Sequence, residues 1–135
     1  MEKNAKIFVA GHRGMVGSAI VREVKRQGYT NIITRTHAEL DLLRQVDVEN
    51  FFEAECPEYV FLAAAKVGGI MANQNSLADF MYENMMLEMN VIHSAWNTRC
   101  KKLEFLGSSC IYPRLAPQPM KESCLLTSGL EKTNE

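Results

Sequence analysis

The sequence lacks an excess of charge of either sign. Its 15 Lys and Arg residues nearly balance 16 Asp and Glu residues, giving a formal net charge of −1 over 135 residues. Because no basic run breaks this balance, electrostatics give no reason to expect nucleic acid or an anionic membrane as a partner. Long hydrophobic runs are also missing, and the apolar stretch that begins at Ile7 is too short for a signal peptide or a membrane span. We therefore predict a protein that binds neither nucleic acid nor membrane.

Cysteine is scarce and widely spaced. The four cysteines are Cys56, Cys100, Cys110 and Cys124, and they form no Cys-x-x-Cys pair and have no histidine at ligand spacing. This spacing argues against a disulfide framework and against a zinc site. The sequence predicts a reduced cytoplasmic protein with no metal site.

Short apolar runs alternate with helical patterns along most of the chain. Continuous apolar strands separated by helices are typical of a parallel sheet covered on both faces. The predicted fold is therefore α/β, a doubly wound parallel sheet of the Rossmann type that binds NAD(P). The expected strands are residues 6–10, 32–34, 59–64 and 103–106, and the expected helices are residues 14–27, 46–54 and 77–96.

The character of the sequence changes from Tyr112 onward. Pro113, Pro117 and Pro119 punctuate a polar stretch, and no closing element precedes Glu135. A doubly wound sheet normally continues into further strands. We therefore expect residues 1–135 to be the N-terminal part of a longer, truncated NAD(P)-binding domain.

A glycine-rich loop lies between the first strand and the first helix. Glycines at this place let the backbone turn tightly and approach a pyrophosphate, which the free N–H groups of the helix N-terminus can bind. The alternative is a tight turn that serves helix packing only. The loop, which predicts a dinucleotide site, consists of Gly11, His12, Arg13, Gly14, Met15, Val16 and Gly17.

The end of the second strand favours NADP over NAD. Enzymes that use NAD usually carry an acid there for the ribose hydroxyls, and this segment has none. Arg13, Arg35 and His37 could meet a 2′-phosphate instead, although Arg35 could equally be a solvated surface residue. Asp41 and Leu42 could border the adenine, with a helix N-cap as the alternative role of Asp41.

Small hydroxylated residues follow the fourth strand, where ligands bind in open α/β sheets. Ser108 and Ser109 could hydrogen-bond a carbonyl, and Cys110 beside them could act as an acid or base. The alternative for Cys110 is inert packing. The methionines at 81, 85, 86 and 89 recur at helical spacing, which favours core or subunit-interface packing.

Three segments together resemble the extended short-chain dehydrogenase/reductase family. They are residues 10–18 (AGHRGMVGS), 62–70 (LAAAKVGGI) and 105–113 (FLGSSCIYP). The resemblance implies an NADP(H)-dependent enzyme that epimerises a GDP-linked keto sugar at C3 and C5 and then reduces it at C4. It also implies a homodimer formed through the long helix of residues 77–96.

The resemblance assigns roles to individual residues. It makes Cys110 the proton-transfer residue of the epimerisations and Ser108 the hydroxyl that holds the C4 oxygen. Residues 37–42 would flank the adenosine, although His37 stands where an arginine is expected. The nicotinamide side would be lined by Leu106, Gly107, Ser108 and Ser109.

The same resemblance implies a catalytic Tyr-x-x-x-Lys pair, which no tyrosine of this chain provides. We expect that pair almost directly after residue 135. The partner histidine and the GDP-binding C-terminal region that the resemblance implies are also missing, so the 135 residues alone should not complete a reduction. Two alternatives remain open at this point: a reductase or epimerase acting on another nucleotide sugar, and a non-catalytic NADP-binding module.

Overall fold

The computed structural model describes residues 1–130. These residues divide into two compact units, the first formed by Met1–Lys66 and Ala78–Leu106 and the second by Val67–Leu77 and the segment from Gly107 onward. All four strands belong to the first unit.

A parallel sheet of four strands in the order β2-β1-β3-β4 forms the centre of the first unit. Ile7 pairs with Ile32 on one side and with Tyr59 on the other, and Tyr59 pairs in turn with Lys102. The strands are β1 (Ile7–Ala10), β2 (Ile32–Ile33), β3 (Tyr59–Leu62) and β4 (Lys102–Phe105). Because the chain leaves β1 for β2 on one side and then crosses to β3 on the other, the strand order reverses between β1 and β3. Open α/β sheets bind their ligands at such a switch point.

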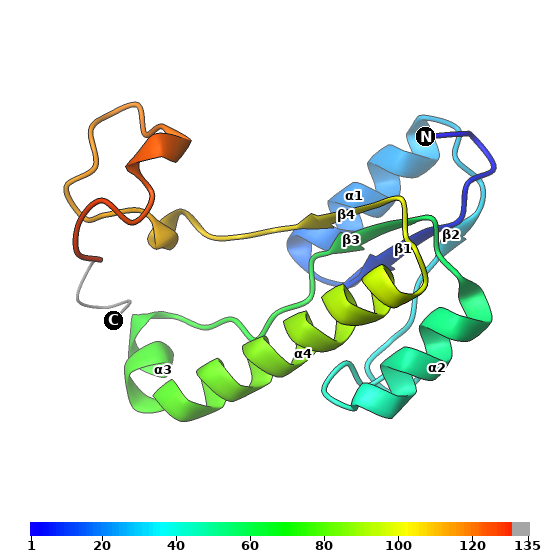
Figure 1. Ribbon diagram of the computed structural model, residues 1–135, viewed down its shortest axis with the longest axis horizontal. Helices are drawn as coiled ribbons and strands as arrows, with labels where there is room; N and C mark the ends of the chain where they lie inside the picture. The colour runs from blue at the N-terminus through cyan, green and yellow to red at the C-terminus, as the bar shows by residue number, and fades with distance from the viewer. Residues whose placement is uncertain (131–135) are drawn as a thin grey trace. The chain divides into compact units, whose positions relative to one another are not determined.

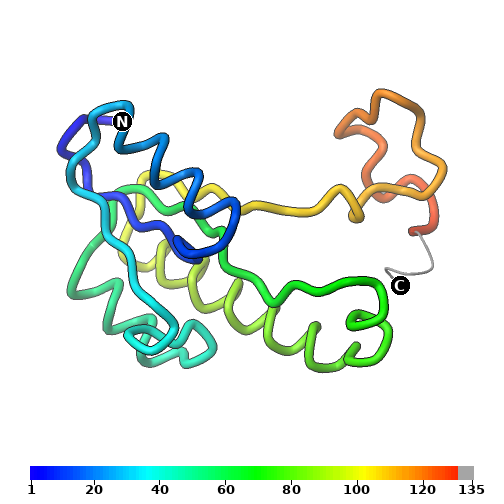
Figure 2. The backbone as a smooth tube through the Cα atoms, turned by 180° about the vertical axis from the view of Figure 1, so that it is seen from behind, coloured from blue at the N-terminus to red at the C-terminus, as the bar shows by residue number. Residues whose placement is uncertain are grey.

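Helices cover both faces of this sheet (Figure 1). Helix α1 (Met15–Arg26) lies on one face, while α2 (Gln45–Glu55) and α4 (Leu77–Asn97) lie on the other, as the view from behind also shows (Figure 2). Alternate residues of β1 supply the two cores: Ile7 and Val9 pack with Val24 of α1, whereas Phe8 packs with Phe52 of α2. The period-two alternation of a strand thus explains why a fully apolar β1 is needed.

The predicted fold class is confirmed, with small differences at the strand ends. The second strand ends at Ile33 and not at Thr34, because β2 is an edge strand that pairs only with Ile7 and Phe8. The third strand ends at Leu62 and the fourth at Phe105, each earlier than expected, while α4 runs to Asn97. Residues 59–64 and 103–106 therefore each finish in loop, at the edge of the sheet where the strands end.

Up to residue 130, the second unit contains only short elements. They are α3 (Ile70–Asn75) and two 3-10 turns, Ser109–Ile111 and Glu122–Cys124. The sequence analysis missed α3, whose six residues follow directly on Gly68 and Gly69. All four cysteines lie within the described residues and are free thiols.

Candidate dinucleotide-binding site

The glycine loop is so tightly packed that two of its positions have no room for a side chain. Gly11 has a φ of +79°, and a Cβ there would lie 2.6 Å from the carbonyl oxygen of Ala63, just past β3. A Cβ on Gly17 would collide with the carbonyl oxygen of Gly11. Glycine is therefore required at both positions, and its absence of a side chain brings the loop, α1 and the end of β3 together.

The N-terminus of α1 is open to an anion. Its N-cap, Gly14, donates its N–H to the carbonyl of Gly11 at 2.9 Å, which closes the turn. Among the described residues no side chain caps this helix, and its first turn carries no acid. The N–H groups of the first turn and the positive end of the helix dipole thus remain available to a phosphate.

A pocket of about 430 Å³ opens at the carboxyl ends of β1 and β3, within the first unit. This volume is in the range that nucleotide-sized ligands occupy. The pocket is lined by Phe8, Ala10, Gly11, His12, Arg13, Gly14, Arg35, Thr36, His37, Leu40, Asp41, Leu42, Leu43, Ala64, Ala65, Lys66, Glu83 and Leu87. It lies at the switch point of the sheet, so the fold puts the glycine loop where a dinucleotide is expected.

The structure brings together most of the residues predicted to bind the cofactor. Gly11, His12, Arg13, Gly14, Arg35, His37, Asp41 and Leu42 all line the pocket. Met15, Val16 and Gly17 do not line it but form the first turn of α1, with Met15 largely exposed. Leu106 donates its N–H to the carbonyl of Leu62 at 3.3 Å and is also outside the pocket lining.

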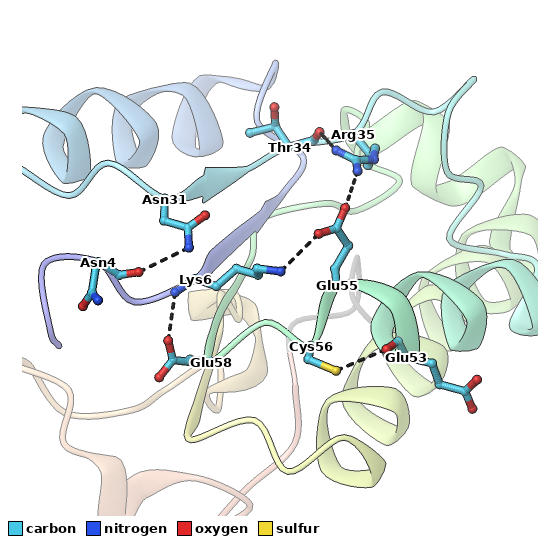
Figure 3. A network of polar contacts seen from close by, with 9 residues as sticks. All are labelled: Asn4, Lys6, Asn31, Thr34, Arg35, Glu53, Glu55, Cys56 and Glu58. Atoms are coloured by element: carbon cyan, nitrogen blue, oxygen red, sulfur yellow. Dashed lines mark hydrogen bonds and ion pairs between the residues drawn. The ribbon is translucent and has the colours of Figure 1, made fainter.

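Arg35 is a paired side chain rather than a freely solvated one (Figure 3). Its Nη2 lies 2.6 Å from Oε1 of Glu55, at the last residue of α2, and its Nη1 donates to the carbonyl of Thr34 at 3.0 Å. The guanidinium also lies over the ring of Phe51, 5.4 Å from its centroid. The second oxygen of Glu55 accepts from Nζ of Lys6 at 3.4 Å, so one carboxylate is shared by two cations.

Asp41 stabilises a turn before α2, and its predicted alternative role as an N-cap is wrong. The helix begins at Gln45 and its N-cap is Arg44. The Oδ1 of Asp41 instead accepts from the N–H of Leu43 at 3.0 Å and lies 3.7 Å from Nε2 of His37. His37 is mostly exposed, so its imidazole borders the pocket from the solvent side.

Glu39 organises the same segment. Its carboxylate accepts from the N–H of Thr36 at 2.7 Å and from the hydroxyl of Thr36 at 2.8 Å. These hydrogen bonds, and then the charges of Arg35 and Arg13, hold the pKa of Glu39 below its ordinary value. The two arginines are therefore near enough to this turn to act on the same carboxylate, from two different loops.

The opposite wall of the pocket is held by α4. Asn84 accepts from the N–H of Lys66 at 2.8 Å and donates to the carbonyl of Lys66 at 3.1 Å. The Nζ of Lys66 pairs with Glu83 at 2.5 Å and lies over the ring of Phe80. Asn90, a buried polar residue of α4, donates to the carbonyl of Leu42 at 2.9 Å. One helix thus fixes both loops that flank the pocket.

The predicted catalytic residues belong to the second unit, together with Gly107 and Ser109. Ser108 is the N-cap of the 3-10 turn Ser109–Ile111, and its Oγ accepts from the N–H of Cys110 at 3.1 Å. Cys110 is exposed and its thiol is free. The turn therefore fixes Ser108 and Cys110 relative to one another and presents the thiol to solvent.

Sequence reasoning missed several residues of the site. Thr36, Glu83 and Asn84 carried no motif, and Glu55 lies 20 positions from the arginine that it contacts. The only available signal was position, since residues directly after a parallel strand share one edge of the sheet. Among residues 1–130, no group of three His, Cys, Asp or Glu side chains is arranged to hold a metal ion. No helix in that range has both the length and the apolar character to cross a membrane.

The fold, the glycine loop and the pocket at the switch point define a dinucleotide-binding α/β protein. Residues 7–135 match the model of the NAD dependent epimerase/dehydratase family. The chain belongs to this family, and the family resemblance inferred from its three motifs is confirmed.

The chain is similar to proteins named GDP-L-fucose synthase. It is 65% identical over 134 residues to GDP-L-fucose synthase 1 of Arabidopsis thaliana, and this match covers 99% of this chain and 42% of the relative. It is 56% identical over 130 residues to GDP-L-fucose synthase of Escherichia coli K12, covering 96% of this chain and 40% of the relative. The chain thus spans about two fifths of the length of these curated relatives.

A solved structure gives the same fold with a nucleotide in place. A GDP-mannoheptose C4 reductase from Campylobacter jejuni with NADP bound superposes with a TM-score of 0.93 at 44% identity. The match covers 98% of this chain and 39% of that one.

Proposed function

We propose that these residues form the N-terminal, NADPH-binding part of an enzyme that converts GDP-4-keto-6-deoxy-D-mannose to GDP-L-fucose. The identity of 65% to a relative named GDP-L-fucose synthase, over 99% of the chain, carries this proposal. The glycine loop, the pocket and the Ser108–Cys110 turn support it, because each is a part that such an enzyme needs.

NADP(H) is the proposed cofactor, and the residues present fit it. The cradle around Gly11 and Gly17, which a Cβ would fill, suits a pyrophosphate at the N-terminus of α1. Arg13, Arg35 and His37 also line the pocket and would bind the 2′-phosphate. When bound, the reduced nicotinamide supplies the hydride for C4 of the sugar. Leu106, Gly107, Ser108 and Ser109 are proposed to flank that ring.

The epimerisations need a group that exchanges protons beside a keto carbon. At C3 and at C5 a C–H bond breaks, its electron pair moves into an enolate stabilised by the C4 carbonyl, and a proton returns on the opposite face. Cys110 is proposed to transfer the proton on one face of the sugar, since an exposed thiol can serve as a general acid or base. The proton on the opposite face needs a second group, for which the family resemblance implies a partner histidine that these residues do not include. Ser108 is proposed to donate a hydrogen bond to the C4 oxygen. For the proton that this oxygen takes up during reduction, the family resemblance implies the tyrosine of the Tyr-x-x-x-Lys pair, which is not among these 135 residues.

A homodimer through α4 is part of the proposal. Met81, Met85 and Met89 are each about half exposed or more, and Ile92 and Trp96 continue the same stripe at spacings of three and four residues. Such an apolar stripe on a helix is typical of a helix–helix interface. The core role that methionine spacing also allowed does not apply to these three residues.

We also propose a cytoplasmic location. The four cysteines are free thiols, and thiols persist in a reducing compartment.

The test is an assay of the full-length protein with GDP-4-keto-6-deoxy-D-mannose. We expect nicotinamide absorbance to fall with NADPH and GDP-L-fucose to appear on chromatography, with a much slower reaction when NADH or a dTDP-linked keto sugar is supplied. Binding of NADPH without turnover of any keto sugar would contradict the proposed enzymatic activity and favour a non-catalytic nucleotide-binding module.

A second candidate is a C4 reductase that does not epimerise its GDP-linked keto sugar. The similarity to the GDP-mannoheptose C4 reductase, at 44% identity, favours it. The two candidates share the hydride transfer and differ in the proton exchange at C3 and C5.

A further inference from the structure

The Arg35 guanidinium is held on three sides before any nucleotide arrives. Glu55 contacts one terminal nitrogen, the carbonyl of Thr34 contacts the other, and the ring of Phe51 lies against its face. Phe51 and Glu55 are four residues apart on α2, so they present the ring and the carboxylate from one side of the helix. A guanidinium has five N–H donors, and these contacts leave others for a phosphate oxygen.

The position of Glu55 argues for a role beyond ordinary surface pairing. It is the last residue of α2, where the helix dipole disfavours a carboxylate, and the last turn of this helix contains no basic residue. The carboxylate is compensated from outside the helix, by Arg35 at 2.6 Å and by Lys6 at 3.4 Å (Figure 3). The three side chains are each about one third exposed, 34% for Lys6 and Arg35 and 28% for Glu55. Solvent screens such pairs, so stabilisation of the fold alone is a weak reason for the arrangement.

We propose that Glu55, with Phe51, is a positioning residue that holds the Arg35 guanidinium at the pocket wall and thereby strengthens the selection of NADPH over NADH. This inference deepens the proposed function and rests on it. An arginine that is already ordered loses little side-chain entropy when it binds a phosphate, whereas a free one loses more. Helix α2 thus takes part in cofactor selection through a residue that does not itself line the pocket.

The test is a double-mutant cycle on Arg35 and Glu55 in the full-length protein, read by fluorescence titration of NADPH and NADH. Ordering one long side chain is worth about 0.5–1.5 kcal/mol, which corresponds to roughly a two- to tenfold change in affinity. We expect Glu55→Ala to weaken the binding of NADPH by this factor and to leave the affinity for NADH unchanged. In the Arg35→Ala background, Glu55→Ala should have no further effect, because the residue acts through Arg35.

Three further variants separate positioning from charge and from folding. Glu55→Gln keeps an acceptor for Arg35 and should retain most of the preference, while Glu55→Asp keeps the charge on a shorter side chain and should behave like Glu55→Ala. Lys6→Met removes the other partner of Glu55 without touching Arg35, so the NADPH/NADH ratio should not change. If Glu55→Ala does not fold, the contrast between Glu55→Gln and Glu55→Asp makes the same test.

Two results would overturn the inference while leaving the proposed function intact. The first is an NADPH/NADH affinity ratio in Glu55→Ala and Glu55→Asp that equals the ratio of the wild type. The contact between Glu55 and Arg35 would then be purely structural. The second is tighter NADPH binding in both Glu55→Ala and Glu55→Gln. This would mean that the negative charge of Glu55 only offsets the positive charge that Arg35 offers to the phosphate. If the wild-type protein does not prefer NADPH, the proposed cofactor itself is wrong.

Discussion

Asn84 hydrogen-bonds both backbone polar groups of Lys66, accepting from its N–H at 2.8 Å and donating to its carbonyl at 3.1 Å. A side-chain amide can make both bonds at once, because its carbonyl oxygen accepts and its NH2 group donates. The contact joins the middle of the first unit's longest helix to the loop that follows β3. Since Lys66 lines the pocket, the helix fixes one wall of the candidate site.

We expect Asn84→Ala to lower the free energy of unfolding by about 1–3 kcal/mol, because two partly buried backbone groups lose their partner. The same change should weaken the binding of NADPH and NADH equally, since it loosens a wall of the pocket that both cofactors would contact. Thermal unfolding and cofactor titration of the full-length protein measure the two effects. Asn97→Ala, an exposed amide near the end of the same helix, is the control and should change neither quantity.

Gly17→Ala should disrupt the glycine loop. The new Cβ would collide with the carbonyl oxygen of Gly11, a backbone atom that cannot move aside without shifting the loop. Overpacking of this kind costs about 1–3 kcal/mol, and we expect dinucleotide binding to be lost with it. Gly129→Ala is the matched control, because a Cβ there meets nothing within 4 Å. An unchanged melting temperature and affinity for Gly17→Ala would show that the loop is not as tightly packed as described.

Glu58 should stabilise the fold at neutral pH, and this stabilisation should be lost in acid. The ammonium of Lys101 and then the N–H of Lys6 bind its carboxylate and hold its pKa below the ordinary value. A carboxyl whose pKa is lowered by folding stabilises the protein above its unfolded-state pKa, and that contribution is lost as the pH falls through the folded-state pKa. Glu58→Gln should therefore lower the melting temperature at neutral pH, and the difference should disappear in acid. A difference independent of pH would contradict this, and Glu53→Gln, an exposed carboxylate of α2, is the control.

Arg13→Ala should weaken the binding of NADPH more than the binding of NADH. Only NADPH carries the 2′-phosphate, and a charge-assisted contact with it is worth about 1.5–3 kcal/mol, or roughly ten- to a hundredfold in affinity. Fluorescence titration of both cofactors gives the comparison. Arg22→Ala removes an exposed arginine of α1 that does not line the pocket, so both affinities should stay as in the wild type. Equal losses for the two cofactors in Arg13→Ala would remove Arg13 from the phosphate site.

The sheet and the glycine loop could be predicted because their determinants are local. The apolar run of β1 and the glycines at 11, 14 and 17 lie within a dozen consecutive residues, and the backbone there has few alternatives. The short helix α3 was missed, since six residues after two glycines carry too little periodicity to distinguish a helix from a loop.

The contacts that shape the pocket could not be predicted, because each joins residues far apart in the sequence. Glu55 pairs with Arg35 over 20 positions and Asn90 binds Leu42 over 48. In the sequence, Asn84 and Asn90 are polar interruptions of an apolar helix. Only the packing of α4 against the sheet reveals that each amide holds a different loop.

Proton NMR of the product formed in deuterated water tests the proposed epimerase–reductase most directly. With full-length protein, NADPH and GDP-4-keto-6-deoxy-D-mannose, we expect deuterium at C3 and C5 and an L-configured product. Cys110→Ser should lose nearly all of this deuterium while still reducing some unepimerised sugar, because a serine hydroxyl is far less acidic than a thiol. A wild-type product that is reduced at C4 but carries no deuterium at C3 or C5 would contradict the account and identify a simple C4 reductase.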